Sequence, residues 1–123
     1  MPRFTISHHD HPDEHWDFFL EHGGELLTWR LAQPMSNRDT IVARKLPNHR
    51  SVYLDYSGPL SGNRGTVTRV MTGQFEWRVG DPDAGIIEIL LSSDVINGVC
   101  VLRHIDADDW ECHFQTMSSS SDS

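Results

Sequence analysis

The chain has 123 residues, which suits one domain with a single hydrophobic core and is too short for two. Its formal net charge of −8 argues against a protein that coats nucleic acid with its whole surface, and no apolar run approaches the roughly 20 residues that span a bilayer. The first ten residues lack the apolar segment of a secretory signal. We expect a soluble cytoplasmic protein without a membrane partner, with one domain over 1–117 and a disordered Ser-rich tail over 118–123.

The N-terminal part predicts a short strand, Phe4–Ser7, followed by a hairpin. Residues 15–22 alternate between two faces, as a strand does. Gly23 and Gly24 supply a tight turn able to adopt positive φ, and residues 25–31 form the returning strand. One face of the first hairpin strand carries Trp16, Phe18 and Leu20, and the other carries His15, Asp17, Phe19 and Glu21.

Further strands are predicted at short, even intervals between turns rich in Gly, Pro, Ser, Asn and Asp. No amphipathic helix stands out, although residues 92–96 could form one helical turn. This rhythm is typical of an antiparallel barrel or sandwich, and we predict an all-β fold, a small antiparallel β-barrel of about eight strands with little helix. The predicted strands are Thr40–Lys45, Ser51–Tyr56, Gly65–Met71, Gln74–Val79, Gly85–Leu91, Gly98–His104 and Trp110–Gln115.

The basic residues gather in the middle of the chain. Residues 40–80 hold six lysines and arginines against two acids, and nine of the ten basic residues of the chain are arginine, whose planar fork suits phosphate. This composition fits local phosphate recognition, and a solvated surface of mixed charge gives the same counts. The two cysteines, Cys100 and Cys112, are expected to be free thiols that fill apolar space.

Histidines are concentrated near the N-terminus, where four of the eight lie within the first 15 residues. His15 and Asp17 are two apart on a predicted strand, so their Cα atoms lie about 6.5 Å apart on one face and both side chains can reach one ion. A third ligand from the preceding segment, His9 or His11, would complete a two-histidine, one-carboxylate site with open positions. A solvated histidine loop is the alternative.

Several short motifs follow one another along the chain. The first are Phe4-Thr-Ile-Ser-His-His9-Asp10, His15-Trp-Asp17-Phe-Phe-Leu-Glu21 and Gly24-Glu-Leu-Leu-Thr-Trp29. Later ones are Asn48-His49-Arg50-Ser-Val-Tyr53, Gly62-Asn-Arg-Gly65-Thr-Val67, Thr72-Gly73-Gln-Phe-Glu76 and Gly98-Val-Cys-Val-Leu102-Arg103, with Trp110 after them. In this order, and over nearly the whole chain, they resemble the 3′-phosphoesterase domain of bacterial DNA ligase D.

The resemblance implies a β-barrel enzyme that holds a divalent metal inside the barrel, usually Mn²⁺ with Zn²⁺ or Co²⁺ as alternatives. Such an enzyme trims the 3′ ends of DNA, removing a 3′-phosphate or a terminal ribonucleotide during break repair. The implied partners are the 3′ ends of primer-template DNA, and DNA ligase or other end-joining repair proteins. Carried over to this chain, the metal ligands would be His9, His15 and Asp17, and the catalytic residues facing the scissile phosphate would be His49 and Tyr53.

Two positions depart from the pattern of the family. Phe19 and Ile41 stand where that pattern has arginines that serve the phosphate. Arg44, on the predicted strand of Ile41, and Arg50, beside His49, are the candidate phosphate-binding substitutes.

Two functional hypotheses from different classes follow. The first is a metal-dependent 3′-phosphoesterase, which the joint presence of the five chemical residues favours. The second is a non-catalytic relative that binds DNA ends or repair proteins as a scaffold module, which Phe19 and Ile41 favour. A third hypothesis, a barrel that binds a small ligand, is supported only by the expected architecture.

Overall fold

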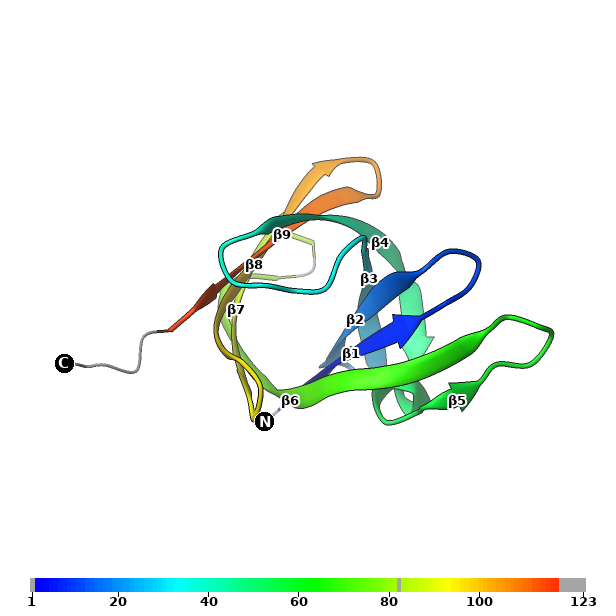
Figure 1. Cartoon of the computed structure of the whole chain (residues 1–123). Coiled ribbons are helices and arrows are strands. Elements are labelled where there is room, and N and C mark those ends of the chain that lie inside the picture. Colours follow the sequence, from blue (N-terminus) through cyan, green and yellow to red (C-terminus); the bar gives the residue numbers. More distant parts are fainter. Residues whose placement is uncertain (1, 82, 118–123) are drawn as a thin grey trace.

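The computed structural model describes residues 2–81 and 83–117, and its regular structure is nearly all β-strand (Figure 1). The predicted tail over 118–123 lies outside the described residues. The strands are β1 (Arg3–His9), β2 (His15–His22), β3 (Glu25–Leu31), β4 (Thr40–Arg50), β5 (Gly58–Pro59), β6 (Thr66–Gly80), β7 (Ile86–Ser93), β8 (Asn97–Asp106) and β9 (Asp109–Thr116), with one short 3₁₀ helix, η1 (Ser51–Leu54).

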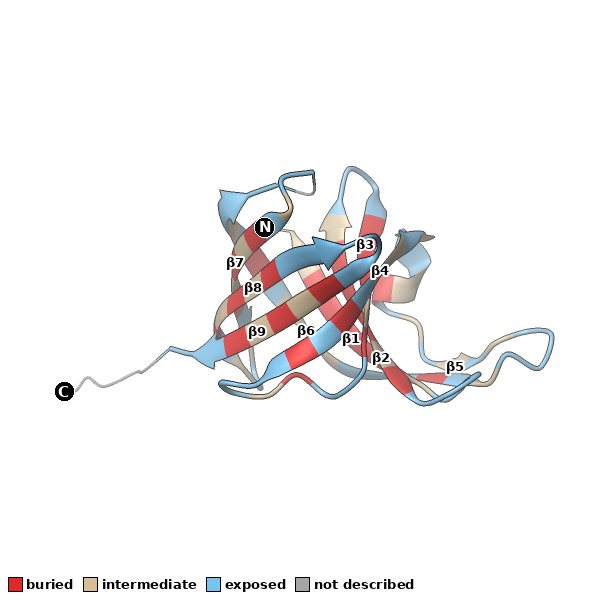
Figure 2. Cartoon of the chain, turned by 90° about the horizontal axis from the view of Figure 1, so that it is seen from above, coloured by how far each residue is buried: buried red, intermediate tan, exposed pale blue. Residues whose placement is uncertain are grey.

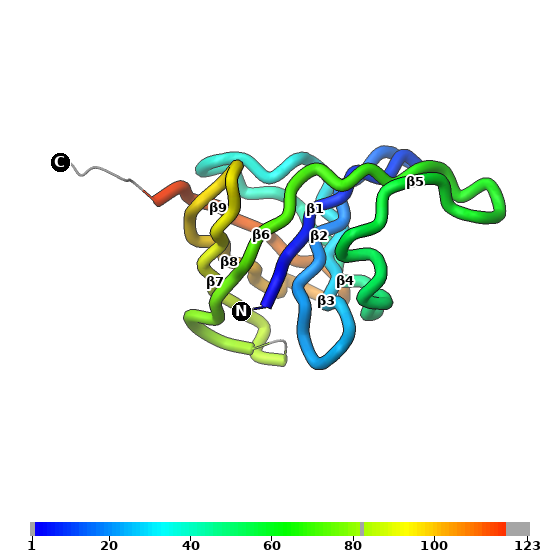
Figure 3. Tube along the Cα trace, turned by 90° about the horizontal axis from the view of Figure 1, so that it is seen from below, coloured from blue at the N-terminus to red at the C-terminus, as the bar shows by residue number. Residues whose placement is uncertain are grey.

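Eight of the strands close into one antiparallel barrel. Their order is β1-β2-β3-β4-β9-β8-β7-β6, and β6 pairs back onto β1 to close the ring. The short β5 pairs with the outer part of β6, and the two project from the barrel as a hairpin beside the β1–β2 connection (Figure 3). The predicted small antiparallel barrel is confirmed. In the described part of the chain, no helix is long and apolar enough to cross a membrane.

The core of the barrel is built by alternate residues of every long strand. Buried bands cross the sheet at every second residue, as expected when only one face of each strand turns inward (Figure 2). Both cysteines are free and fully buried in this core, as predicted, and their Sγ atoms lie 3.6 Å apart. The largest core residues are Phe4, Phe18, Trp29, Phe75 and Phe114.

The strand predicted over Ser51–Tyr56 is wrong. After Arg50 the chain turns into η1, which lies against the outer face of β1, β2 and β3. The turn places Leu54 in a small second cluster with Phe19 and Leu26, and the Leu54 carbonyl accepts a hydrogen bond of 2.7 Å from the Thr5 hydroxyl. One helical turn therefore covers apolar side chains that an extended segment would leave exposed.

The two strands predicted on either side of Thr72 and Gly73 are one continuous strand, β6. Its first half pairs with β1 and its second half with β7, and Gly73 pairs with both neighbours. A Cβ atom at Gly73 would lie 2.2 Å from the Ser92 carbonyl oxygen, so glycine serves close packing there rather than a turn. The alternative of a helical turn over 92–96 is also wrong, because β7 runs to Ser93 and a short turn follows.

The hairpin turn at Gly23 and Gly24 is confirmed. Both glycines have positive φ, +61° and +84°, and the flanking His22 and Glu25 pair across the turn. This two-residue connection sets the register of β2 against β3.

Candidate metal centre

The predicted ligands come from the paired ends of β1 and β2. His9 pairs with His15 across the two strands, and Asp17 follows two residues later on β2. Because side chains alternate along a strand, His15 and Asp17 lie on the face opposite Phe18 and Leu20, which fill the barrel core. The expectation that the metal ligands lie inside the barrel is therefore wrong: they lie on its outer face, because aromatic and aliphatic side chains occupy the interior.

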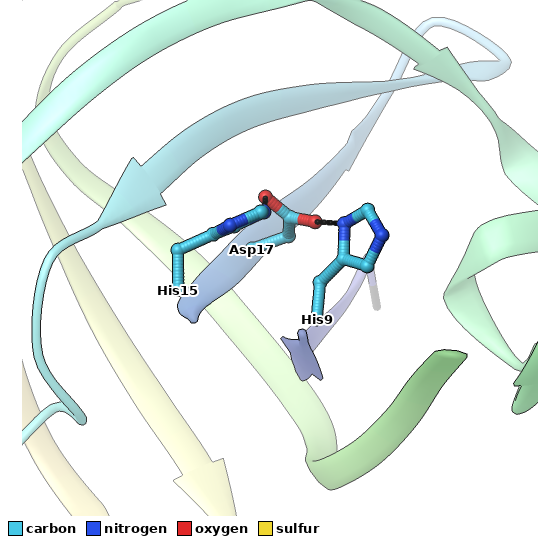
Figure 4. Close-up of side chains that lie close together, drawn as sticks. All are labelled: His9, His15 and Asp17. Carbon is cyan, nitrogen blue, oxygen red and sulfur yellow. Dashed lines mark ion pairs between the residues drawn. The ribbon is translucent and has the colours of Figure 1, made fainter. Parts of the chain in front are cut away.

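The three side chains converge. One ligand atom from each of His9, His15 and Asp17 lies within 4.8 Å of the other two. The Asp17 carboxylate lies between the two imidazoles, with Oδ2 3.8 Å from His9 Nδ1 and Oδ1 3.3 Å from His15 Nε2 (Figure 4). His15 and Asp17 are only 4% and 6% exposed, so both side chains are almost completely shielded from solvent.

Backbone carbonyls fix the tautomers of both imidazoles. His15 Nδ1 lies 2.8 Å from the Asp13 carbonyl oxygen, and His9 Nε2 lies 2.8 Å from the Arg64 carbonyl oxygen. A carbonyl oxygen only accepts, so each of these nitrogens is the N–H donor, and in the neutral ring the other nitrogen carries the lone pair. Both lone pairs then face the Asp17 carboxylate, which is the outer-shell arrangement typical of metal-binding histidines.

Several buried polar atoms around Asp17 lack hydrogen-bond partners among the described residues: Ser7 Oγ, His15 Nε2, Asp17 Oδ1 and Arg30 Nε. The distance between His15 Nε2 and Asp17 Oδ1 is short, but the two atoms are not aligned for a hydrogen bond. Buried acceptors without donors are costly, and a cation between them would remove that cost. Two imidazole nitrogens and one carboxylate oxygen suit a divalent transition metal with open coordination positions. The residues present therefore fit the metal that the sequence predicts.

His11, the alternative third ligand, does not join the group. It is exposed in the β1–β2 connection, while His9 at the end of β1 completes the set.

A hollow of about 310 Å³ opens beside the metal-ligand group, and we call it the His49 hollow. It is lined by His9, Asp17, Arg30, His49, Tyr53 and Arg64, among others. The structure thus brings both predicted catalytic residues to the predicted ligands. His49 packs between Phe19 and Tyr53, with ring centroids 5.5 and 5.8 Å away, and His49 Nδ1 donates to the Pro47 carbonyl at 3.1 Å, which leaves Nε2 without a protein partner in the described chain.

The predicted phosphate-binding arginines lie at the margins of the site. Arg44 lines a neighbouring hollow with His15 and Arg30, which we call the Arg44 hollow. Arg50 is exposed, and its guanidinium lies 5.9 Å from the centre of the Tyr53 ring. Ile41 is buried in the barrel core, so position 41 does not face the site in this chain.

Sequence reasoning missed Arg30. This residue pairs with Asp17 across β2 and β3, and it lines both hollows. The signal was present in the sequence, because a two-residue turn at Gly23 and Gly24 places residues 17 and 30 opposite each other. Arg64, which also lines the His49 hollow, lies on a loop whose position no sequence pattern fixes.

Loop contacts hold His9 in place. Asp10 Oδ1 accepts a hydrogen bond of 2.7 Å from the Thr66 N–H, and this contact joins the start of β6 to the residue that follows β1. That hydrogen bond lowers the pKa of the Asp10 carboxyl. Gly65 has φ +82°, and a Cβ there would lie 2.2 Å from Asp10 Oδ1, so the Gly-Thr-Val motif needs its glycine for this close contact.

The fold and the site define a small β-barrel protein with a group of two histidines and one carboxylate on its outer face that could hold a metal ion. The family model of the DNA ligase D 3′-phosphoesterase domain matches residues 7–110, most of the chain, and the chain belongs to this family. No curated protein matches the sequence. Family membership connects the chain with 3′-phosphoesterase-related function and, in general terms, with DNA ends and their repair.

Proposed function

We propose that the protein is a metal-dependent 3′-phosphoesterase that acts on 3′ ends of DNA, removing a 3′-phosphate or a terminal ribonucleotide in end repair. The observation that carries this proposal is the convergence of three ligand atoms, with both imidazole tautomers fixed, beside a hollow that His9 and Asp17 line together with His49 and Tyr53. Such a hollow would place a cation next to neutral and charged hydrogen-bond donors. Phosphoryl transfer needs both, because they stabilise the negative charge on the phosphoryl oxygens.

His9, His15 and Asp17 would hold the cation, and Mn²⁺ is the ion we propose. A bound divalent ion supplies Lewis-acid chemistry, because it polarises a phosphoryl oxygen and makes a nearby water more acidic. The hydrogen bonds to the Asp13 and Arg64 carbonyls keep both rings oriented for this role before the ion arrives.

His49 and Tyr53 would act on the phosphate from the opposite wall of the hollow. With Nδ1 engaged by the Pro47 carbonyl, His49 presents Nε2 to the substrate, where the protonated ring can donate to a phosphoryl or leaving oxygen. Tyr53 packs edge-on against His49, which limits the ring positions of His49, and the Tyr53 hydroxyl is a second donor for a phosphoryl oxygen.

The rest of the substrate would lie over the arginines around the two hollows. Arg44 and Arg50 are both exposed beside the site and would bind backbone phosphates of primer-template DNA. We propose a cytoplasmic protein that works beside a DNA ligase or other end-joining proteins.

The test is release of phosphate from a primer-template duplex with a 3′-phosphate. The natural protein is expected to release phosphate with Mn²⁺ and to stop in excess chelator. Asp17→Ala and His9→Ala are expected to lower the rate at least about 100-fold, because each removes a ligand of the cation. His8→Ala is the matched control for His9→Ala, since His8 is adjacent on β1 and pairs with Glu14 instead. Equal rates for the natural protein and Asp17→Ala would overturn the proposal.

A second candidate function, a non-catalytic module that binds DNA ends, is favoured by Phe19. This side chain is 2% exposed and packs with Leu26 and Leu54, so it puts an apolar surface in the hollow beside the ligands. Tight binding of primer ends with no phosphate release at any Mn²⁺ concentration would establish this candidate in place of the enzyme.

A further inference from the structure

Arg30 is a charged, half-buried residue of β3 whose side chain faces the metal-ligand group. Its Nε is buried and has no hydrogen-bond partner among the residues that the structure describes. A guanidinium group keeps its charge at every physiological pH, so it cannot avoid the cost of burial by losing a proton. A buried charged donor of this kind calls for an anionic acceptor.

The nearest acids do not fill that role. Asp17 is directly opposite Arg30 in the β2–β3 register, yet no ion pair joins the two side chains. Asp13 and Glu14 line the Arg44 hollow with Arg30, and no ion pair in the described chain joins either of them to Arg30. The guanidinium therefore remains available to a ligand in the hollows that it lines.

The surroundings of Arg30 select a phosphate. The His49 hollow adds the unengaged Nε2 of His49 and the positive charge of Arg64, whose guanidinium also donates to Ser61. Positively charged or donor groups therefore line it from β3, β4 and the loop before β6. The apolar ring of Phe19 borders the same hollow and keeps water from part of it, which strengthens charge-assisted hydrogen bonds. A planar fork matches two oxygens of a tetrahedral phosphate better than a single point charge does.

We propose that Arg30 binds the terminal phosphate group of the substrate in the His49 hollow, beside the metal ligands. The assignment rests on the proposed function for the identity of the substrate, a 3′-phosphorylated DNA end. Arg30 then distinguishes a phosphate end from a hydroxyl end, whereas Arg44 and Arg50 bind backbone phosphates that both kinds of end possess.

The test measures end preference without turnover. Fluorescence anisotropy with added Mn²⁺ compares a primer-template duplex ending in a non-hydrolysable 3′-methylenephosphonate with the same duplex ending in a 3′-hydroxyl. The natural protein is expected to prefer the phosphonate, and Arg30→Gln is expected to lower that preference about 10- to 100-fold, with binding of the hydroxyl end little changed. Arg78→Gln, an exposed arginine of β6, is the matched control and keeps the preference.

A second pair of variants guards against a misfolded Arg30→Gln protein. Phe19→Arg in the Arg30→Gln background returns a guanidinium to the same hollow, because Phe19 and Arg30 both line it, and is expected to restore part of the preference. Arg30→Lys keeps the charge but loses the fork, and is expected to retain an intermediate preference. Equal end preference in the natural protein and Arg30→Gln, or no preference in the natural protein, would overturn the inference.

The outcomes separate this inference from the proposed function. An Arg30-dependent preference in a protein that releases no phosphate supports Arg30 as the phosphate-binding residue and refutes the phosphoesterase. Phosphate release with an unchanged rate and unchanged preference in Arg30→Gln supports the enzyme and refutes the role of Arg30.

Discussion

Neighbouring side chains of β2 point alternately into the barrel and onto its outer face, and on both faces they are almost equally buried. Phe18 and Leu20 point into the barrel, where they have no exposed surface and pack in the apolar core. His15 and Asp17 point outward and are nearly as buried, yet atoms of both lack hydrogen-bond partners in the described structure. The inner face buries apolar groups that need no partner, while the outer face buries polar groups that have none in the described chain and can accept a ligand.

Successive residues of β2 therefore alternate between a face that stabilises the fold and a face that carries the candidate site. Apolar burial on the inner face contributes to the free energy of folding. Burial of unpaired acceptors on the outer face opposes folding, and it leaves a group of acceptors that could hold a cation. Substitutions on the two faces of one strand should therefore change different measured quantities.

The largest effect on stability is expected for Phe18→Ala. Its ring is fully buried and packs edge-on against Phe4 at 6.2 Å between centroids, so its loss leaves a cavity in the core. The free energy of unfolding should fall by about 3–5 kcal/mol, as measured by urea denaturation. The Mn²⁺ affinity of the folded fraction should stay within a few-fold of the natural value. A loss of less than about 1 kcal/mol would mean that packing on the inner face of β2 contributes little to the stability of the fold.

The next effect is on metal binding. Asp17→Asn keeps the size of the side chain and removes its charge, so Mn²⁺ affinity should fall at least about 100-fold, measured from free Mn²⁺ by electron paramagnetic resonance. The free energy of unfolding without metal should not fall by more than about 1 kcal/mol, since the substitution gives the two imidazole lone pairs an N–H donor. Asp106→Asn, an exposed acid of β8, is the control. A large loss of stability in Asp17→Asn would show that the carboxylate serves the fold instead.

The sequence predicted the convergence of the ligands better than their location. A spacing of two residues fixed His15 and Asp17 on one face of a strand. Which face turns inward could not be read from the pattern, because Phe19 makes the ligand-bearing face look partly apolar. Phe19 does pack against apolar neighbours, but they are Leu26 and Leu54 of the outer cluster.

Other parts of the site depend on contacts between distant segments. The family resemblance brought His49 and Tyr53 into the site, whereas periodicity alone predicted a strand where η1 forms. The burial of Leu54 against Phe19 decides that conformation, and a local pattern does not contain it. The hairpin register was enough to predict the position of Arg30, but the role proposed for it depends on its buried Nε having no hydrogen-bond partner in the described chain, which only the structure shows.

A third prediction concerns the loop that supports His9. Gly65→Ala places a Cβ 2.2 Å from Asp10 Oδ1 at a φ of +82°, so the contact with the end of β1 must open. Unfolding free energy should fall by about 1–3 kcal/mol, and Mn²⁺ affinity should fall with it, since His9 loses its Arg64 carbonyl partner. Gly62→Ala is the matched control, with φ +71° and open space around the new Cβ; it should cost about 1–2 kcal/mol and leave Mn²⁺ affinity unchanged. Equal Mn²⁺ affinity in the two variants would show that the loop does not position His9.

The smallest effect is expected at a surface ion pair beside η1. Arg3 Nη2 lies 2.6 Å from Asp55 Oδ1, and this hydrogen bond, with Arg69 nearby, lowers the pKa of the Asp55 carboxyl below its ordinary value. A carboxyl with a lowered pKa in the folded state binds a proton less readily there than in the unfolded chain. Its contribution to stability is therefore present above the unfolded pKa and is lost as the pH falls through the folded pKa.

Asp55→Asn should lower the free energy of unfolding by less than about 1 kcal/mol at pH 7, because the Asp55 side chain is 60% exposed and solvent screens the pair. The difference between Asp55→Asn and the natural protein should shrink as the pH falls below about 4, where the carboxyl of the unfolded chain takes up a proton. It should also shrink in 1 M salt, measured by urea denaturation at each condition. If the difference in the free energy of unfolding stays constant across pH, Asp55 stabilises η1 through hydrogen bonds that do not depend on its charge. The ion pair would then contribute nothing to holding η1 over the outer face of the barrel.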